Sequence, residues 1–199
     1  MSYVYKIIDS PIGKLKLIAN GSRLSAILWE NDKPNRVRLG PIHEDKASPI
    51  LAETERQLNE YFAGKRNCFE LELDFAGTEF QRKVWEALLT IPFGETRSYG
   101  EIAVQIGNAK AVRAVGAATG KNPISIITPC HRVIGASGDL TGFAGGLGAK
   151  KMLLTLESGV KKDARSAFSH FQMADSLGIS EATEKLKEVE SSRSSNNKD

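Results

Sequence analysis

Cys130 and His131 are adjacent in an apolar stretch, and together they could act as a nucleophile and its base. A cysteine near its reference pKa of about 8.5 is only about 3% thiolate at neutral pH, so attack by its sulfur requires a base or a positive charge close by. Arg132 follows directly, and no Asp or Glu occurs from Ile102 to Gly138. The sequence therefore predicts a thiol in electropositive surroundings.

Cys130 could instead be a packing residue, because buried free cysteines are common and usually inert. A metal site is less well supported. The two cysteines and three histidines form neither a CxxC pair nor a pair of histidines one helical turn apart. We therefore expect no bound metal, whereas the role of Cys130 stays open on these residues alone.

The 199-residue chain is 41% hydrophobic and 26% charged, which is typical of a soluble globular protein of one or two domains. No segment approaches the roughly 18 apolar residues of a membrane span, and the amino terminus lacks the pattern of a signal peptide. We expect a cytoplasmic protein with reduced thiols and no membrane partner. The net charge of +3 is modest, but the acid-free tract concentrates positive charge where phosphates could bind.

Period-two alternation predicts several strands in the first part of the chain. The strands cover Tyr3–Ile8, Lys14–Ala19, Leu24–Trp29 and Phe69–Leu73, with a helix between Ser48 and Phe62. These elements predict a small α+β domain over residues 1–76.

Capping boxes at Thr78 and Ser98 predict the starts of two helices. We expect Asn108 to cap a third helix over Ala109–Thr119, with Gly120 ending it. Two short helices joined by a tight turn are typical of a helix-turn-helix unit.

The last of these helices combines small residues with two long cations, Lys110 and Arg113. Small residues let a backbone approach a large partner closely, although the same composition would suit a helix packed tightly against a neighbour. The preceding capped helix and the absence of acidic residues favour DNA binding.

Six glycines between residues 135 and 148 predict a turning loop after the thiol, and this loop could line a pocket. It lacks the spacing of a phosphate-binding P-loop. A helix is predicted over Leu147–Leu156, ending at Glu157 and Gly159. Residues 77–158 form the predicted second domain. Residues 159–199 are predicted to be a polar tail, partly helical near Ile179–Val189 and disordered at its end.

Several separated motifs occur in the order and spacing of one known family. They are Pro129-Cys130-His131-Arg132-Val133, Asn122-Pro123, the loop Gly142-Phe143-Ala144-Gly145-Gly146-Leu147 and the helix pair. With these motifs, residues 1–157 strongly resemble the O6-alkylguanine-DNA alkyltransferases, and Ser10-Pro11-Ile12-Gly13 is similar to the constitutive bacterial form. The resemblance implies an α+β fold, in which a small ribonuclease H-like sheet-plus-helix domain precedes a mainly helical, winged helix-turn-helix domain for DNA binding and catalysis.

The resemblance also implies an activity, which is DNA repair by direct reversal. Such a protein binds duplex DNA through the minor groove and flips out O6-methylguanine, and O4-methylthymine as well. It then moves the alkyl group irreversibly to its own cysteine, once per molecule, as a monomer and without a cofactor. Extrusion must come first because the alkyl carbon is inaccessible to in-line attack within the base stack.

The resemblance assigns catalytic roles to five residues of this sequence. Cys130 would accept the alkyl group, with His131 acting through a water as base and Glu157 orienting the imidazole. Asn122 would hold the active-site turn, and Tyr99 would donate a hydrogen bond or proton toward the guanine.

By the same resemblance Arg113 would fill the gap left by the flipped base. The other residues expected to contact DNA are Lys110, Ala114, Thr119, Lys121 and Arg132. The residues expected to line the substrate pocket are Tyr99, Val133, Phe143, Ala144 and Gly145. Many relatives have Tyr and Ser where this chain has Phe143 and Ala144, so we expect retained activity with an altered preference among alkyl groups.

Two other functions fit parts of the sequence. A DNA-lesion sensor or regulator would bind DNA and leave Cys130 unmodified. A cysteine hydrolase would use Cys130, His131 and Glu157 on a small molecule with repeated turnover, and would ignore duplex DNA. The helix that carries Arg113, with no acidic residue near it, counts against the hydrolase.

Overall fold

The computed structural model describes residues 2–176, with side chains through Lys161. The chain divides into two compact units, residues 1–158 and 159–199. Of the second unit only the continuation of a helix to Ser176 is described, so the helix predicted near Ile179–Val189 and the disordered end lie outside the described residues. None of the helices in residues 2–176 is long and apolar enough to cross a membrane.

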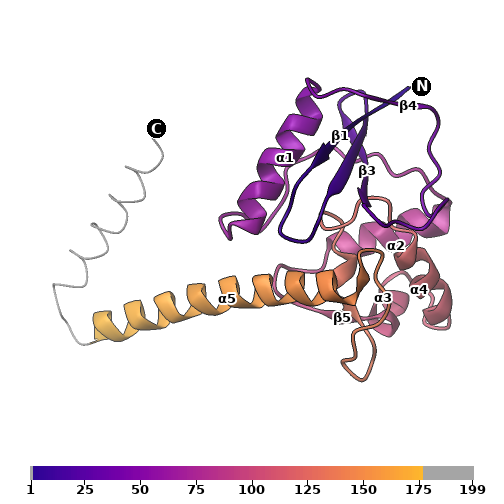
Figure 1. The fold of residues 1–199 in the computed structure, drawn as a ribbon. Coiled ribbons are helices and arrows are strands. Elements are labelled where there is room, and N and C mark those ends of the chain that lie inside the picture. Colours follow the sequence, from indigo (N-terminus) through magenta and orange to yellow (C-terminus); the bar gives the residue numbers. More distant parts are fainter. Residues whose placement is uncertain (1, 177–199) are drawn as a thin grey trace. The chain divides into compact units, whose positions relative to one another are not determined.

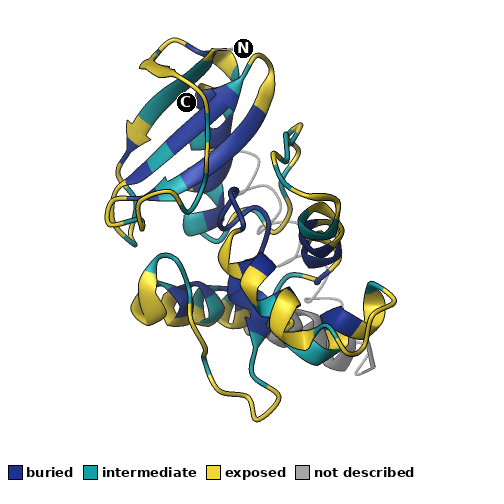
Figure 2. Ribbon diagram, turned by 90° about the vertical axis from the view of Figure 1, so that its right-hand side faces the viewer, coloured by how far each residue is buried: buried dark blue, intermediate teal, exposed yellow. Residues whose placement is uncertain are grey.

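The amino-terminal part of the first unit is a four-stranded sheet with a helix packed against it (Figure 1). Its elements are β1 (Tyr3–Ile8), β2 (Leu15–Asn20), β3 (Arg23–Trp29), β4 (Ile42–Glu44) and α1 (Pro49–Phe62). The strand order is β3-β2-β1-β4, with β4 parallel to β1 and the other pairs antiparallel. The sheet is buried mainly along β2 and the edge strand β3 (Figure 2), whereas most residues of β1 are only partly buried.

Apolar side chains of the sheet and of α1 form the amino-terminal core. Leu17 and Ile27 from the strands meet Leu51 and Leu58 from the helix, and all four are fully buried. Burial of each such side chain stabilises the fold by roughly 1.5–3 kcal/mol. The helix begins at Pro49, whose fixed φ suits the first position of a helix.

The strand predicted over Phe69–Leu73 is wrong. Among the described residues, the backbone hydrogen bonds of this segment to the sheet involve Leu24 alone, whose N–H donates to Glu72 O (2.9 Å) and whose carbonyl accepts from the following Asp74 N (2.8 Å). Its apolar side chains pack against the core, which explains the alternation without a strand ladder. Strand β4 was not foreseen, because its three exposed residues carry no apolar pattern.

The second part of the first unit is mainly helical. Its elements are α2 (Glu79–Leu89), β5 (Arg97–Ser98), α3 (Tyr99–Gln105), α4 (Val112–Gly120), β6 (Val133–Ile134) and the start of α5 (Gly146–Ser176). Both predicted capping boxes are confirmed, since Thr78 accepts from Gln81 N and Ser98 accepts from Glu101 N. The short helices α3 and α4 form the predicted helix pair and pack on each other.

Two helix boundaries differ from the prediction. Helix α4 begins at Val112 and not at Ala109, because the Asn108 carbonyl accepts from Ala111 N in a separate turn and no side chain caps the helix. Helix α5 does not end at Gly159 but continues beyond it. A glycine inside a helix costs about 1 kcal/mol relative to alanine, which is not enough by itself to break the helix.

Trp85 fixes α2 against α4. Its ring is buried, and its Nε1 donates to Ala118 O at 2.9 Å. Gly77 lies so close to this ring that an added Cβ would sit 2.5 Å from two of the ring carbons. The absence of a side chain at position 77 therefore lets Trp85 occupy the place from which it holds α4.

We predict that Gly77→Ala lowers the free energy of unfolding by about 1–3 kcal/mol, because the new methyl group must displace the buried Trp85 ring. Gly100→Ala is the matched control, since its nearest contact would be an ordinary 3.7 Å and the residue lies within α3. The control should be neutral or stabilising by up to about 1 kcal/mol. Urea unfolding at neutral pH measures both, and equal stabilities would contradict the packing argument.

Candidate active site

Buried amide contacts hold the turn that presents Cys130. Asn122 Nδ2 donates to Thr128 O at 2.9 Å, and Asn122 Oδ1 accepts from Ile124 N at 3.1 Å. Between these contacts the chain adopts a left-handed conformation at Ile126 (φ +74°), which is unfavourable for a β-branched residue. A short 3-10 turn then begins at Cys130. The Asn122 side chain therefore fixes a strained segment directly before the thiol.

His131 and Glu157 form a buried pair next to this turn. His131 Nε2 lies 2.8 Å from Glu157 Oε1, and neither side chain is exposed. Burial lowers the pKa of His131, against the opposing effect of its hydrogen bond with Glu157, so the ring is neutral at neutral pH. An ionised carboxylate only accepts hydrogen bonds, so Nε2 carries the ring hydrogen. This leaves Nδ1 with a free lone pair, and within the described residues it has no hydrogen-bond partner.

The Glu157 carboxylate accepts hydrogen bonds from several segments at once. Oε1 accepts from the Tyr61 hydroxyl at 2.8 Å, and Oε2 accepts from Gly94 N at 3.1 Å. Arg132 donates to both oxygens, at 2.8 and 2.9 Å. Burial alone would raise the pKa of this carboxyl, but the hydrogen bonds from His131 and Arg132 outweigh it and lower the pKa to about 2. Glu157 is therefore ionised at neutral pH.

Arg132, which the sequence predicts to contact DNA, faces inward in this structure. Its side chain is 8% exposed, and besides Glu157 it donates to Ile91 O at 2.7 Å. Thr119 also lies inside, and its hydroxyl has no hydrogen-bond partner among the described residues. These two side chains are removed from the surface at which a phosphate group could approach.

Cys130 is buried as well, with 5% of its surface exposed. Burial raises the pKa of its thiol, while the Asn122 hydrogen bond and the charges of Arg36 and Lys150 act in the opposite direction. The sulfur is therefore protonated at rest. The surroundings are electropositive, as predicted, but the cations that act on the sulfur are Arg36 and Lys150, whereas Arg132 pairs with Glu157.

Lys150 is a fully buried cation that the sequence patterns do not reveal. From α5 its Nζ donates to Val133 O at 2.6 Å and to Thr141 O at 3.0 Å. Burial lowers the pKa of this ammonium group, and Cys130 acts in the opposite direction. The two hydrogen bonds tie both ends of the glycine-containing loop to the helix that also carries Glu157.

The predicted pocket residues lie around two small spaces. Tyr99, Phe143 and Ala144 line a hollow of about 380 Å³, together with two glycines of α4. Phe143 and Ala144 also border an enclosed space of about 10 Å³ next to Cys130, about the room that one water needs. The structure thus brings Tyr99 and the loop together beside the thiol. Val133 and Gly145, in contrast, line neither space.

Trp29 of β3 supports the loop from the amino-terminal sheet. Its ring packs edge to face on Phe143, with centroids 5.3 Å apart, and its Nε1 donates to Ser125 Oγ at 3.1 Å. A Cβ added at Gly145 would lie 2.7 Å from the indole. Because Gly145 has no side chain, the loop can lie directly on the Trp29 ring. Gly145 therefore faces Trp29 and does not line the hollow.

The solvent face of α4 and its flanks carry the remaining residues predicted to contact DNA. Arg113, Ala114, Lys110 and Lys121 are all exposed. The three cations form no ion pair with any side chain that the structure describes. This surface is therefore positively charged and open to a partner.

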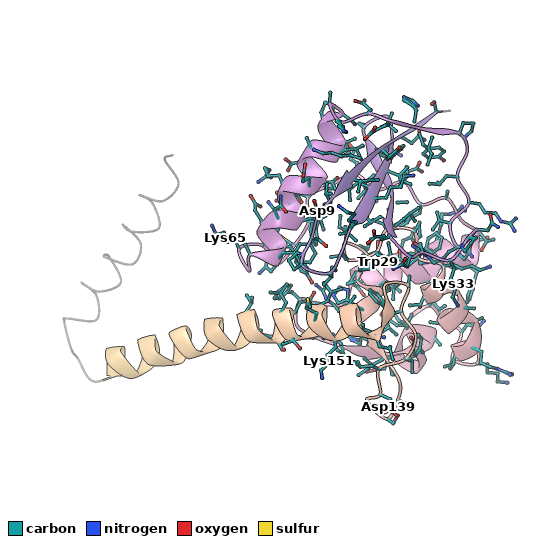
Figure 3. All side chains as sticks on the ribbon, in the orientation of Figure 1. Asp9, Trp29, Lys33, Lys65, Asp139 and Lys151 are labelled. Carbon is teal, nitrogen blue, oxygen red and sulfur yellow. The ribbon has the colours of Figure 1, made fainter. Side chains whose placement is uncertain are left out.

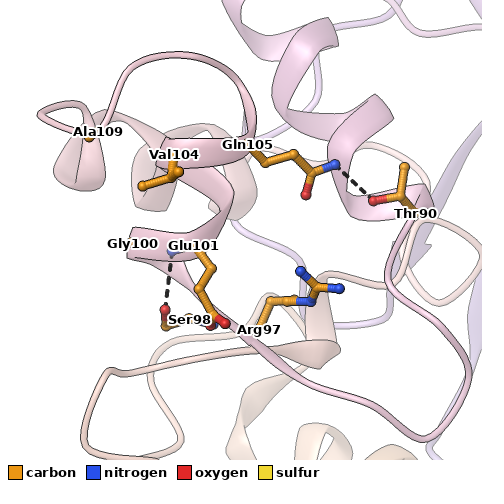
Figure 4. Close-up of a pocket in the computed structure, with 8 residues that line it drawn as sticks. All are labelled: Thr90, Arg97, Ser98, Gly100, Glu101, Val104, Gln105 and Ala109. Carbon is orange, nitrogen blue, oxygen red and sulfur yellow. Dashed lines mark hydrogen bonds between the residues drawn. The ribbon is translucent and has the colours of Figure 1, made fainter.

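A larger hollow of about 830 Å³ lies along α3 and reaches Ala109, next to Lys110 (Figure 4). It is bordered by Arg97, Glu101 and Val104, and Gln105 Nε2 donates to Thr90 Oγ1 beside it at 2.9 Å. None of the predicted site residues lines it, so its size alone does not mark it as the active site.

Two family profiles match almost the whole first unit. The ribonuclease-like domain of 6-O-methylguanine DNA methyltransferase matches residues 3–75, and the DNA binding domain of the same protein matches residues 79–159. This chain belongs to the 6-O-methylguanine DNA methyltransferase family. The profile of the DNA binding domain ends within α5, just past Glu157.

Individual methyltransferases agree with this assignment. The methylated-DNA–protein-cysteine methyltransferase of Mycobacterium tuberculosis is 55% identical over 155 residues, which cover 77% of this chain and 91% of the relative. The protein of the same name from Methanosarcina acetivorans is 49% identical over 153 residues, or 77% of this chain and 97% of the relative. A crystal structure of Mycobacterium tuberculosis OGT in complex with DNA has a TM-score of 0.72 and 51% identity, covering 80% of this chain and 94% of that chain. The predicted fold, a sheet domain followed by a helical DNA-binding domain, is confirmed.

The charge of Glu157 should stabilise this methyltransferase in a pH-dependent way. Glu157→Gln leaves the buried Arg132 guanidinium uncompensated, so we expect a loss of about 3–5 kcal/mol in the free energy of unfolding at neutral pH. The pKa of Glu157 is about 2 in the folded protein, below the usual 4.5 of a glutamate, so its contribution is complete above pH 4.5 and is lost as the pH falls toward 2. The stabilities of wild type and variant should converge across that window.

Urea unfolding at a series of pH values measures this convergence. Glu79→Gln is the matched control, because Glu79 is exposed and pairs with Lys83 at the surface. The control should cost less than about 1 kcal/mol at any pH. A gap between wild type and Glu157→Gln that stays constant down to pH 2 would show that the carboxylate charge is not the stabilising feature.

Proposed function

We propose that this protein repairs DNA by direct reversal of O6-alkylguanine. It transfers the methyl group from O6-methylguanine in duplex DNA to Cys130 Sγ, irreversibly and once per molecule, as a methylated-DNA–protein-cysteine S-methyltransferase. The observation that carries the proposal is His131 Nδ1, a buried nitrogen with a free lone pair on the residue next to a buried thiol. Membership of the family supplies the class of reaction.

The chemistry is a nucleophilic substitution at the alkyl carbon. His131 Nδ1 takes the thiol proton through one water, while Glu157 stabilises the imidazolium on the other side of the ring. The sulfur forms the new S–C bond as the C–O6 bond breaks, and the electron pair of that bond moves into the guanine. Tyr99 then protonates the departing base and regains a proton from solvent, while His131 releases the former thiol proton to solvent. The thioether at Cys130 is stable, so each molecule acts once.

The surroundings of Tyr99 support its role as a donor. Thr141 Oγ1 donates to the Tyr99 hydroxyl at 2.9 Å, which leaves the phenolic hydrogen for another acceptor. Tyr99 and Phe143 border the same hollow, so a base lying there would be within reach of the phenol. Asn122 holds the backbone of the turn, and it also donates the side-chain hydrogen bond that favours the thiolate.

Burial of the thiol suits a protein that can react only once. Because the resting sulfur is protonated and hardly exposed, it reacts little with electrophiles in solution. The space of about 10 Å³ next to Cys130 holds no purine, so the loop at Phe143 must shift when a flipped base enters. The thiol therefore becomes reactive when a flipped base brings its alkyl group next to Cys130.

Helix α4 is the proposed DNA-reading element. Arg113 enters the space left by the flipped base, and the small residues Ala114 and Gly116 allow the helix to approach the minor groove closely. Lys110 and Lys121 bind backbone phosphates at the two ends of the helix. Affinity should depend on salt and little on sequence, since these contacts do not read bases.

The remaining features of the proposal follow from the same resemblance. Phe143 and Ala144 offer no hydroxyl, so hydrogen bonds that relatives make through Tyr and Ser are replaced by apolar contact, and the preference among alkyl groups changes. O4-methylthymine is a further substrate. The protein acts as a cytoplasmic monomer without a cofactor, with domains over residues 1–76 and 77–158 and a polar tail over residues 159–199.

A lesion sensor is the alternative that shares the DNA-binding surface. Such a protein needs no base beside its cysteine, whereas here a buried carboxylate fixes the His131 ring and leaves its other nitrogen without a hydrogen-bond partner among the described residues. An unpaired buried nitrogen is unfavourable in a structural role. This observation favours alkyl transfer over sensing.

Intact-protein mass spectrometry after incubation with duplex DNA containing one O6-methylguanine tests the proposal. We expect a gain of one methyl group, about 14 Da, that saturates at one per molecule and maps to Cys130. Cys130→Ser should bind the same DNA without gaining mass, because a hydroxyl is a far weaker nucleophile than a thiolate. DNA binding by the wild type without any mass change would support the sensor instead.

Arg113→Ala should separate base flipping from binding. Loss of the side chain removes what fills the gap in the stack, so the rate of methyl transfer should fall by at least tenfold with a much smaller loss of affinity, in keeping with an unstacking cost of a few kcal/mol. Lys110→Ala is the control, because a lost phosphate contact weakens binding without a separate effect on flipping. Fluorescence of a 2-aminopurine beside the lesion reports flipping, and equal losses of flipping and binding in Arg113→Ala would contradict the proposed role.

A further inference from the structure

A basic loop of the amino-terminal domain lies beside the DNA-reading half of the protein. The connection between β3 and β4 carries Lys33, Arg36 and Arg38 within six residues. Figure 1 shows that this connection leaves the sheet and runs down to the level of α2 before it returns to β4. Nothing in the proposed reaction uses Lys33 or Arg38.

Arg36 anchors this loop to the active-site segment. Its guanidinium pairs with Asp32, the two side chains being 7% and 10% exposed, and its Nη1 donates to the carbonyl of Asn122. The loop turns at Asn35, which adopts a left-handed φ of +61°, and Arg36 N donates to Lys33 O at 3.1 Å. The loop therefore has a defined position relative to the turn that carries the thiol.

Two hollows flank Arg36, and each is bordered by a further cation of the loop. Arg38 borders a hollow of about 420 Å³ together with Lys121 and with Gln81 at the start of α2. Lys33 borders the hollow of about 380 Å³ that also contains Tyr99 and two glycines of α4. The two lysines and Arg38 thus surround the carboxyl end of α4.

The charges at these hollows are not neutralised within the described part of the chain. No carboxylate borders the hollow at Arg38, and the one that borders the other hollow, Asp32, is already paired with Arg36. Lys33, Arg38 and Lys121 are exposed and form no ion pair with any described side chain. Exposed cations held around a hollow without an acid attract an anion.

We propose that Lys33 and Arg38 bind backbone phosphates of the DNA that lies across α4, so that the amino-terminal domain forms a second part of the DNA interface. This inference rests on the proposed function, because it requires DNA at α4. The ligand is a nucleic-acid phosphodiester, since the two cations flank the end of the reading helix and Lys121 continues the same positive surface. Such contacts position the duplex and carry no sequence information.

The salt dependence of DNA binding tests this contact. Affinity for a short undamaged duplex would be measured at several salt concentrations for wild type, Lys33→Gln, Arg38→Gln and the double variant. The slope of log K against log salt is negative, and each lost phosphate contact should make it less steep by about 0.9. In the double variant the steepness should fall by about twice that amount. Lys65→Gln is the control of equal charge change, because Lys65 lies by α1 on the opposite side of the first unit from Lys33 (Figure 3).

A second arm separates DNA from a free anion as the ligand. Under the proposal the hollows bind the phosphates of a duplex and do not hold free phosphate. Inorganic phosphate titrated into the DNA-free protein should therefore change the melting temperatures of wild type and of the double variant equally. Stabilisation by phosphate that disappears in the double variant, with an unchanged DNA slope, would overturn the proposal in favour of a small-anion site. Slopes of the variants that equal those of wild type and Lys65→Gln would overturn it as well.

Failure of this inference can be told apart from failure of the proposed function. Wild type that methylates Cys130 but shares its salt slope with the variants would reject the second contact alone. Wild type that binds DNA with the expected slopes but never gains a methyl group would reject alkyl transfer and keep the contact. Wild type that does not bind duplex DNA at any salt concentration would reject both.

Discussion

The buried carboxylate of Glu157 is the interaction on which the rest of the site depends. It receives hydrogen bonds from Tyr61 of α1, from the backbone at Gly94, and from His131 and Arg132 of the thiol turn. A carboxylate in a dry interior is very unfavourable unless its charge and its lone pairs are satisfied. Here both are, and as a result segments from both halves of the first unit meet at one ionised group.

This arrangement also sets the protonation state of the base. Because Glu157 and Arg132 neutralise each other, the cluster at rest consists of a neutral ion pair, a neutral imidazole and a neutral thiol. Transfer of the proton from Cys130 to His131 creates one anion and one cation together, so the net charge of the interior does not change. The fields of Arg36 and Lys150 then favour the thiolate, which burial alone opposes. Tyr61 makes the amino-terminal domain part of this arrangement, since its hydroxyl shares Oε1 with His131.

Local patterns in the sequence predicted most of the elements, and the failures have a common cause. The capping boxes at Thr78 and Ser98 involve residues three apart, so the sequence contains all of the information. The segment Phe69–Leu73 alternates like a strand, yet whether it pairs depends on a distant edge that only the fold supplies. In the same way the Cys130 and His131 pair is visible in the sequence, but nothing local identifies Tyr61 as a partner of Glu157.

Positive charge gives the clearest example of what a sequence pattern leaves undetermined. Arg36 and Arg38 are two residues apart and chemically identical, yet one is buried against Asp32 while the other borders an open hollow. Arg132 and Lys150 likewise face inward, where they satisfy a carboxylate and backbone carbonyls, whereas Lys121 faces solvent. A net charge of +3 says nothing of this division. The inward cations hold the thiol turn and the loop in place, and only the outward ones are available to DNA. Substitution of an inward cation should therefore change the free energy of unfolding, whereas substitution of an outward one should change the salt dependence of DNA binding.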